Sequence, residues 1–183
     1  ARLLGEIGRM HETRGRDAGL AFHAWARAFA VDPHDETARG EIDRIAGGAG
    51  AWNELVEAYE RGIAAAGDDA ALVSQLLATV ARIHDEKRGD PRSAIETYER
   101  LLAHDPNDPS PLDALEALHT LVGDWNGLVD VLGRKVELTY DATERAELLR
   151  RMGSVLEELI GDSAKAVEAY AKAAGEDPQD PVA

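Results

Sequence analysis

The chain has 183 residues, of which 44% are hydrophobic, 5% are aromatic and none is cysteine. The absence of cysteine excludes disulfides, thiolate chemistry and cysteine-type zinc sites. The formal net charge of −15 predicts repulsion from a phosphate backbone, so sequence-independent binding of nucleic acid is not expected.

The sequence shows no membrane or secretion signal. No apolar run approaches the roughly 18 residues that indicate a membrane-spanning helix, so direct membrane insertion is not expected. No charged and apolar leader opens the chain, and a cytoplasmic location is the expectation. The sequence starts and stops inside its own repeating pattern, which we interpret as a fragment of a longer protein.

The first predicted element is a helical hairpin over about residues 1–35. Apolar residues at helical spacing predict a helix over about Arg2–Thr13, and Gly15 is in position to follow its end. Asp17 is a suitable cap for a second helix, which Asp32-Pro33 ends. The apolar stripe of that second helix is predicted to be Leu20, Ala21, Ala24, Trp25, Ala28 and Phe29.

The second predicted hairpin, over about 36–67, has weaker signals. A helix from Glu36 is expected to end near Ala46, because glycine is unfavourable inside a helix and Gly47-Gly48-Ala49-Gly50 follows. This glycine-rich run has no strand before it and no Lys-Ser/Thr after it, so it indicates a helix break and no phosphate loop. The side chains predicted to be buried on the next helix, from Trp52 to about Ala65, are Trp52, Leu55, Val56, Tyr59 and Ile63.

The third hairpin is predicted over about 68–108. Its long first helix covers about Ala70–Lys87, and Pro91 suits the first position of the partner helix. Asp105-Pro106 ends that partner. The predicted core positions are Leu72, Leu76, Leu77, Val80, Ile83, His84, Ala94, Ile95, Tyr98, Leu101 and Leu102.

Two further hairpins are predicted over about 109–140 and 141–183. The fourth hairpin pairs helices over about Pro111–Leu121 and Trp125–Leu138, and the fifth pairs Ala142–Leu159 with Ser163–Gly175. Their core positions are predicted to be Leu112, Leu115, Leu118, Val122, Trp125, Leu128, Val129, Leu132, Val136, Leu148, Leu149, Met152, Val155, Leu156, Ala166, Val167, Tyr170 and Ala173.

Alternate hairpins repeat with a period of 72 or 73 residues. Their Asp-Pro pairs fall at 32–33, 105–106 and 177–178. A regular period of this kind indicates a repeat array. The repeated positions are Gly8, His11, Ala21, Trp25 and Ala28 in hairpin one, Ala81, His84, Ala94, Tyr98 and Leu101 in hairpin three, and Gly153, Leu156, Ala166, Tyr170 and Ala173 in hairpin five.

This pattern resembles the tetratricopeptide repeat family, with hairpins two and four resembling degenerate repeats. The turn inside the matching hairpins is about one residue longer than in the commonest repeat. The resemblance implies an all-α fold, a right-handed α-solenoid of about five stacked antiparallel hairpins over residues 1–183. Its small residues, Gly8, Ala81 and Gly153, are expected where two helices approach closely.

No catalytic or metal motif is found in the sequence, and neither enzymatic activity nor a cofactor is expected. The histidines show no ligand spacing. His11, His84 and His119 occupy positions where the family places packing residues, so we interpret them as core or groove-edge side chains.

The resemblance places the binding surface on the concave face, which the first helices line. The peptide-binding positions transferred from the family are Arg9, Glu12, Thr79, Arg82, Asp85, Glu86, Arg150, Arg151 and Ser154. One hypothesis is that the arginines form a locally positive track that binds carboxylates or carbonyls of a peptide. The alternative is that Arg9 pairs with Glu12 and Arg82 with Asp85 along their own helices.

The leading interpretation is a non-catalytic scaffold that binds a protein or peptide segment on its concave face. The acidic surface favours encounter with a basic partner. One alternative is a structural spacer that self-associates through uncapped end faces, and another is a regulatory repeat domain attached to an enzyme.

Overall fold

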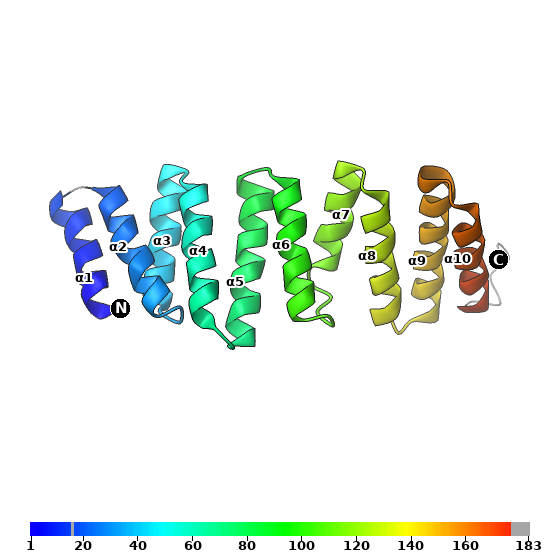
Figure 1. The fold of residues 1–183 in the computed structure, drawn as a ribbon, viewed down its shortest axis with the longest axis horizontal. Helices are drawn as coiled ribbons and strands as arrows, with labels where there is room; N and C mark the ends of the chain where they lie inside the picture. Colours follow the sequence, from blue (N-terminus) through cyan, green and yellow to red (C-terminus); the bar gives the residue numbers. More distant parts are fainter. Residues whose placement is uncertain (16, 177–183) are drawn as a thin grey trace. The chain divides into compact units, whose positions relative to one another are not determined.

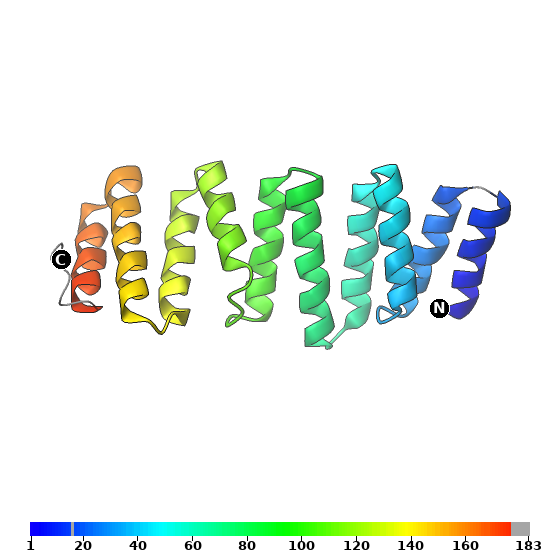
Figure 2. The same ribbon diagram turned by 180° about the vertical axis from the view of Figure 1, so that it is seen from behind.

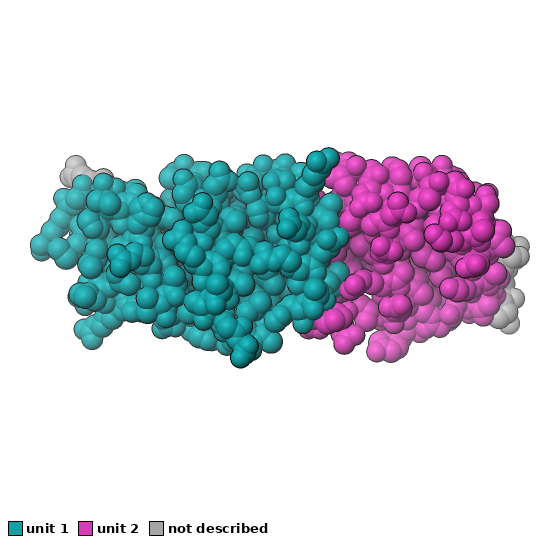
Figure 3. Space-filling view, in the orientation of Figure 1, with its two compact units in different colours: residues 1–104 teal, residues 105–183 magenta. Residues whose placement is uncertain are grey.

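A computed structural model describes residues 1–15 and 17–176, and the regular elements in these ranges are all helical (Figure 1). The predicted all-α fold class of antiparallel helix hairpins is therefore confirmed. The contacts divide the chain into two compact units, Ala1–His104 (unit 1) and Asp105–Ala183 (unit 2), which are coloured separately in Figure 3.

Unit 1 consists of three antiparallel hairpins in chain order. Its core joins side chains from all three, among them Trp25, Phe29, Tyr59 and Leu76. The elements are α1 (Arg2–Met10), η1 (His11–Gly15), α2 (Ala18–Val31), α3 (Glu36–Ala49), α4 (Trp52–Ala66), α5 (Ala70–Arg82), η2 (Ile83–Lys87) and α6 (Pro91–His104), where η marks a π-helical segment.

Unit 2 contains two hairpins, best followed from behind in Figure 2. Leu128 and Leu132 of the fourth hairpin pack against Val155 of the fifth. The elements are α7 (Leu112–Val122), α8 (Trp125–Leu138), α9 (Ala142–Ser154), η3 (Val155–Ile160) and α10 (Ser163–Glu176). The predicted stop at Asp177-Pro178 lies outside the described residues.

The first helix of each tetratricopeptide-like hairpin ends in a π-helical turn. In η2, the Asp90 amide donates to the His84 carbonyl at 2.9 Å, and the Asp90 carboxylate accepts from the Ser93 amide at 3.2 Å at the start of α6. The wider π-turn accommodates the one additional residue that the sequence shows in this turn. The same aspartate therefore closes one helix and caps the next.

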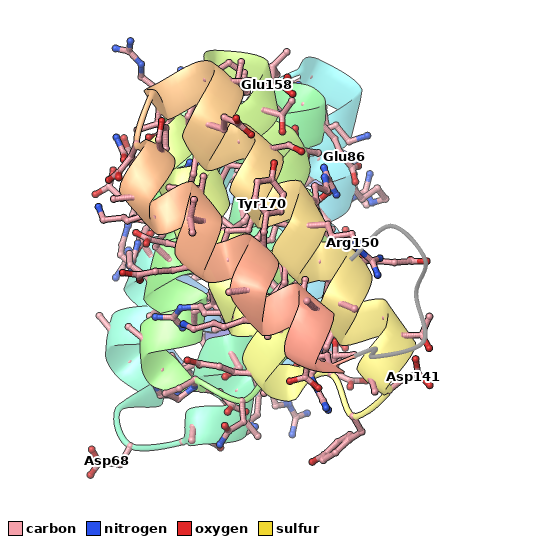
Figure 4. The ribbon with its side chains drawn as sticks, turned by 90° about the vertical axis from the view of Figure 1, so that its right-hand side faces the viewer. Asp68, Glu86, Asp141, Arg150, Glu158 and Tyr170 are labelled. Carbon is pink, nitrogen blue, oxygen red and sulfur yellow. The ribbon has the colours of Figure 1, made fainter. Side chains whose placement is uncertain are left out.

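Glycines permit the closest helix contacts inside the hairpins. A Cβ atom added to Gly8 would lie 2.6 Å from Nε1 of Trp25, and one added to Gly153 would lie 2.5 Å from the Tyr170 ring. Since no side chain fits at such distances, the predicted close approach at these two glycines is confirmed. Figure 4 shows Tyr170 between α10 and α9.

The predicted helix break at Gly47-Gly48 is wrong, because α3 continues through both glycines to Ala49. Gly50 alone has a left-handed backbone, with φ of 67°, and ends the helix. Burial of Ile42, Ile45 and Ala46 against the core of unit 1 offsets the cost of two helical glycines, because packing provides most helical stability in proteins.

Gly15 was expected to follow the first helix, but it is the last residue of η1. Some of the predicted core positions are exposed or only partly buried. Val167 is 66% exposed, Leu20 48% and Val122 38%. The partly buried positions are Trp52, Val56, Ile63, Ile95, Trp125, Val129, Val136, Leu148, Met152 and Tyr170. Leu20 and Val122 lie at helix ends, where fewer neighbours cover them, and Val167 lies on the side of α10 that faces away from α9.

Candidate functional site

Six of the predicted binding residues lie in unit 1, on the first helices of two hairpins. Arg9 is in α1 and Glu12 in η1. The other four are Thr79 and Arg82 in α5 and Asp85 and Glu86 in η2. We call the side of unit 1 formed by α1, α3 and α5 the first-helix face.

Arg9 lies over an aromatic ring. Its guanidinium carbon is 5.6 Å from the centroid of Trp25, a cation–π geometry, and the Trp25 ring is itself only 2% exposed. The indole Nε1 is buried without a hydrogen-bond partner within the described residues. Because Gly8 lies directly beneath the indole, Arg9 and Gly8 together enclose the ring.

The expected pairing of Arg9 with Glu12 is not formed. Glu12 instead accepts a hydrogen bond from Arg44 of α3 at 2.5 Å, and Arg44 also binds Glu41 at 2.6 Å. The Arg44–Glu12 pair therefore joins two hairpins, whereas the Arg44–Glu41 pair runs along α3. Because Arg44 is exposed and both carboxylates are partly exposed, the contribution of these pairs to stability is modest.

Arg82 is the position in hairpin three that corresponds to Arg9. It is exposed, and within residues 1–15 and 17–176 it forms no ion pair, with Asp85 or with any other carboxylate. Its positive charge acts on two tyrosines. Burial raises the pKa of both Tyr59 and Tyr98, and the field of Arg82 opposes that rise in each.

The Tyr59 hydroxyl anchors a polar cluster beside Arg82. It donates to Asp43 of α3, with distances of 2.9 and 3.0 Å to the two carboxylate oxygens. Burial raises the pKa of Asp43, while the Tyr59 hydrogen bond and the charge of Arg39 oppose the rise. The charge of Arg39 thus acts on the Asp43 carboxylate, and the charge of Arg82 acts on the tyrosine that binds it.

Sequence reasoning missed Arg39 and Asp43, because they lie in the hairpin that matches the repeat poorly. A signal was nevertheless present. Tyr59 was predicted to be buried, and a buried tyrosine hydroxyl usually needs a partner. The four-residue spacing of Arg39 and Asp43 on α3 also places them on one face of that helix.

The three predicted residues of unit 2 lie on α9, where Figure 4 labels Arg150. Arg151 binds Glu116 of α7 at 2.5 Å, and Glu116 also accepts from Lys135 of α8 at 2.6 Å. Although burial opposes ionisation of Glu116, the hydrogen bonds from Lys135 and Arg151 lower its pKa. Arg151 therefore joins the helices of unit 2.

Ser154 is the position in hairpin five that corresponds to Arg9 and Arg82. Its hydroxyl lies 3.3 Å from that of Tyr170, which donates to Glu157 at 3.2 Å. The three equivalent positions therefore all lie beside an aromatic residue of the partner helix. Of the predicted arginines, Arg82 is the one whose exposed guanidinium has neither an ion pair nor a stacked ring within the described ranges.

The histidines interpreted as packing residues are buried at two of three positions. His84 is 7% exposed and His119 is 2% exposed, whereas His11 is half-buried. The described residues include no group of three side chains placed to hold a metal ion. They also include no helix long and apolar enough to cross a membrane.

Comparison with protein families identifies one repeat directly. The model of the tetratricopeptide repeat family matches residues 76–110, which contain most of α5, η2 and α6. The resemblance to this family is therefore confirmed. No curated protein matches the chain significantly.

Several solved structures have a similar arrangement of helices. The structure of MamA AMB-1 is 16% identical, with 99% of this chain and 93% of that chain covered and a TM-score of 0.50. This likeness concerns the fold alone. Another MamA structure is 14% identical, with coverages of 97% and 92% and a TM-score of 0.49. YrrB, described as a TPR protein with an unusual peptide-binding site, is 14% identical, with coverages of 96% and 86% and a TM-score of 0.48.

Proposed function

We propose that this tetratricopeptide-repeat chain is a non-catalytic scaffold that binds a protein segment on its first-helix face. The observation that supports this most directly is Arg82, an exposed guanidinium without an ion pair in the described residues. A guanidinium has donors suited to carboxylate and carbonyl groups. Arg82 is therefore available to a partner.

The surroundings of Arg82 suit an extended peptide. Tyr98 is almost buried, but its hydroxyl makes no hydrogen bond within the described part of the chain. Thr79 lies nearly one turn before Arg82 on α5, and its hydroxyl donates to the Gln75 carbonyl at 3.0 Å, which leaves the hydroxyl oxygen able to accept. Donor and acceptor groups thus alternate along one face, as backbone recognition requires.

The charge of the whole chain sets the expected class of partner. A net charge of −15 favours encounter with a basic protein. The expected ligand is a segment of such a protein that places a carboxylate or a backbone carbonyl opposite Arg82. The same charge opposes binding to nucleic acid.

The experiment first identifies a partner by affinity capture with the full chain and mass spectrometry, and then compares charge-reversal variants in direct binding. Arg82→Glu should weaken binding by about tenfold or more, because repulsion replaces attraction. Arg92→Glu is the matched control, since Arg92 is an exposed arginine of α6 without an ion pair in the described ranges. Unchanged affinity of a folded Arg82→Glu variant would refute the proposal.

Arg151 is a poor test of binding. Reversing its charge would place a carboxylate against Glu116, its partner at 2.5 Å. A loss of affinity in such a variant could therefore reflect disruption of unit 2.

A second candidate function, self-association through end faces, has its own observation. Leu3 and Met10 of α1 are 71% and 53% exposed, and Val167 of α10 is 66% exposed. These are large apolar side chains on the first and last helices of the described chain. Light scattering over a range of concentrations distinguishes the two functions, because a strict monomer contradicts self-association.

A further inference from the structure

Unit 2 contains an open hollow on the side of its second helix, α8. The hollow has a volume of about 780 Å³. Val129, Gly133 and Leu138 of α8 line it together with Met152 of α9, and the chain before α7 closes one side with Pro106. All of these residues belong to unit 2, and none is among the binding positions discussed above.

Gly133 distinguishes this hollow from the rest of the surface. Three helical glycines elsewhere in the chain receive a ring from a neighbouring helix, with Trp25 against Gly8, Phe29 against Gly62 and Tyr170 against Gly153. Gly133 is half-buried, yet no atom lies within 4 Å of the place where its Cβ would be. Packing within the described chain therefore does not explain a glycine here.

Other glycines with open space around them do not resemble Gly133. Gly40, Gly48 and Gly175 also have no atom within 4 Å of an added Cβ, but all three are exposed and none lines this hollow. Gly133 combines a bare backbone with a recessed position. This is the geometry that accepts a ring at Gly8, Gly62 and Gly153.

The rim of the hollow is charged and has no internal ion pairs. Asp130, Arg134 and Glu137 line it, and within residues 105–176 none of them forms an ion pair. Unit 2 as a whole has seventeen acidic and seven basic residues, so its net charge is −10. A cation entering the rim would be attracted both locally and by the field of the unit.

We propose that this hollow docks a partner segment in which an aromatic side chain is flanked by lysine or arginine. The ring lies against the bare backbone of Gly133, between Val129 and Met152, whose thioether makes favourable contacts with aromatic rings. The flanking cations pair with Asp130 and Glu137. This site is separate from the first-helix face, so its existence does not depend on the function proposed for Arg82.

The experiment uses the full chain and three synthetic peptides with blocked ends, Lys-Lys-Trp-Lys-Lys, Lys-Lys-Ala-Lys-Lys and Glu-Glu-Trp-Glu-Glu. Chemical shifts of ¹⁵N-labelled protein are followed by NMR as each peptide is added. The lysine–tryptophan peptide should shift the amides around Gly133. The other two should bind at least about tenfold more weakly, since each lacks one of the two recognition features. Equal binding of the alanine peptide, or shifts that avoid the hollow, would overturn the proposal.

Gly133→Leu tests the position of the ring. The Cβ of the new side chain would meet no atom within 4 Å, so the leucine can enter the hollow, and leucine favours a helix more than glycine does. Binding of the lysine–tryptophan peptide should fall by more than about tenfold, whereas Gly40→Leu, at the exposed glycine of α3, should leave it unchanged. Retained binding by folded Gly133→Leu contradicts the proposal.

Two further variants keep the result unambiguous. Asp130→Lys should weaken binding of the lysine–tryptophan peptide while Gly133 is kept. This result can be interpreted even if Gly133→Leu folds poorly. Arg82→Glu should leave the peptide affinity unchanged, which separates this site from the first-helix face. A parallel effect of Arg82→Glu, or no effect of Asp130→Lys, would place the peptide elsewhere and overturn the proposal.

Discussion

Gly127 and Gly133 lie within two turns of each other on α8, yet a methyl group added at each would meet different surroundings. At Gly127 the new atom would lie 2.2 Å from Cε1 of His119, and at Gly133 it would have no neighbour within 4 Å. His119 is only 2% exposed, so its ring has little space to move away. The two glycines therefore provide a matched pair.

Gly127→Ala should destabilise the protein by about 1–3 kcal/mol, the usual cost of overpacking. Gly133→Ala should stabilise it by roughly 0.5–1 kcal/mol, because alanine is the better helix residue and no contact is lost. Urea denaturation of both variants measures the two free energies of unfolding. Changes of the same sign would show that the contact between α7 and α8 is not as described.

His84 makes the stability of the protein depend on pH. Burial lowers its pKa from the ordinary 6.5, as does the nearby Arg88, while Asp90, Glu60 and Glu96 oppose this. Just below pH 6.5, the folded state therefore binds fewer protons than the unfolded state. Because stability rises with pH wherever the unfolded state binds more protons, the contribution of His84 is lost as the pH falls through 6.5.

Replacing His84 by glutamine removes the titrating group but keeps an acceptor for Arg88, whose Nη1 lies 2.6 Å from the histidine Nδ1. The free energy of unfolding of His84→Gln should fall less steeply than that of the unmodified protein between about pH 8 and pH 5.5. Thermal or urea unfolding at several pH values checks this. Parallel curves for the two proteins would exclude His84 as the source of the slope.

At the scale of helices, two aspartate caps of unit 2, Asp124 and Asp141, are not equivalent. Asp141 accepts a hydrogen bond from the Glu144 amide at 2.9 Å and caps α9. Asp124 caps α8 through the Gly127 amide at 3.1 Å, and its second oxygen lies 3.0 Å from Nδ1 of the buried His119. One carboxylate thus ties the end of α7 to the start of α8.

Asp141→Ala should cost about 1 kcal/mol, the typical value of an N-cap. Asp124→Ala should cost about 1 kcal/mol more than that, because a buried imidazole loses its partner as well. Chemical denaturation of both variants gives the comparison. Equal costs would mean that the bond to His119 contributes nothing to stability.

The helices were predictable from sequence to within a few residues, but several of their ends were not. The helix Trp125–Leu138 is found as predicted, because its apolar spacing and the turn before it indicate the same boundaries. The π-helical turns were not predicted, because a change from one backbone hydrogen-bond pattern to the next leaves no mark in apolar periodicity. The continuation of α3 through Gly47-Gly48 was missed because tertiary packing outweighs local propensity.

At the scale of the whole chain, the partners in several ion pairs could not be predicted from a single sequence. The expected pairs along one helix, Arg9 with Glu12 and Arg82 with Asp85, are absent from the described residues. Arg44 and Arg100 reach carboxylates 32 and 40 positions away, Glu12 and Glu60, whereas Arg61 does pair with Glu57 along its own helix. Helical spacing predicted which face these residues share, but it could not predict which helix lies opposite.

The connection between α6 and α7, residues 105–111, separates the two units. Asp105, Pro106 and Asn107 are exposed, and local opening there requires few buried contacts to be lost. A protease that cleaves before aspartate should therefore divide the chain first at Asp105 or Asp108. Mass spectrometry of the fragments over time identifies this cut.

The turn at Gly67–Asp69, inside unit 1, provides the comparison for that digestion. It also presents aspartates, but cutting there would separate α4 from α5, which pack against each other. If this turn is divided as early as residues 105–108, the two units do not behave as separate cooperative bodies.

Hairpins whose first helix ends in a π-turn alternate with hairpins that lack one in the described residues. This alternation limits how such a chain can change length. Each π-turn begins 72 residues after the preceding one, at His11, Ile83 and Val155, so the repeating unit is two hairpins and not one. Gain or loss of a single hairpin would bring two of the same kind together, and the surfaces that meet would no longer be those that evolved to fit. Adding or removing hairpins two at a time therefore keeps the alternation, and this sets the cutting points for shortening or extending the chain.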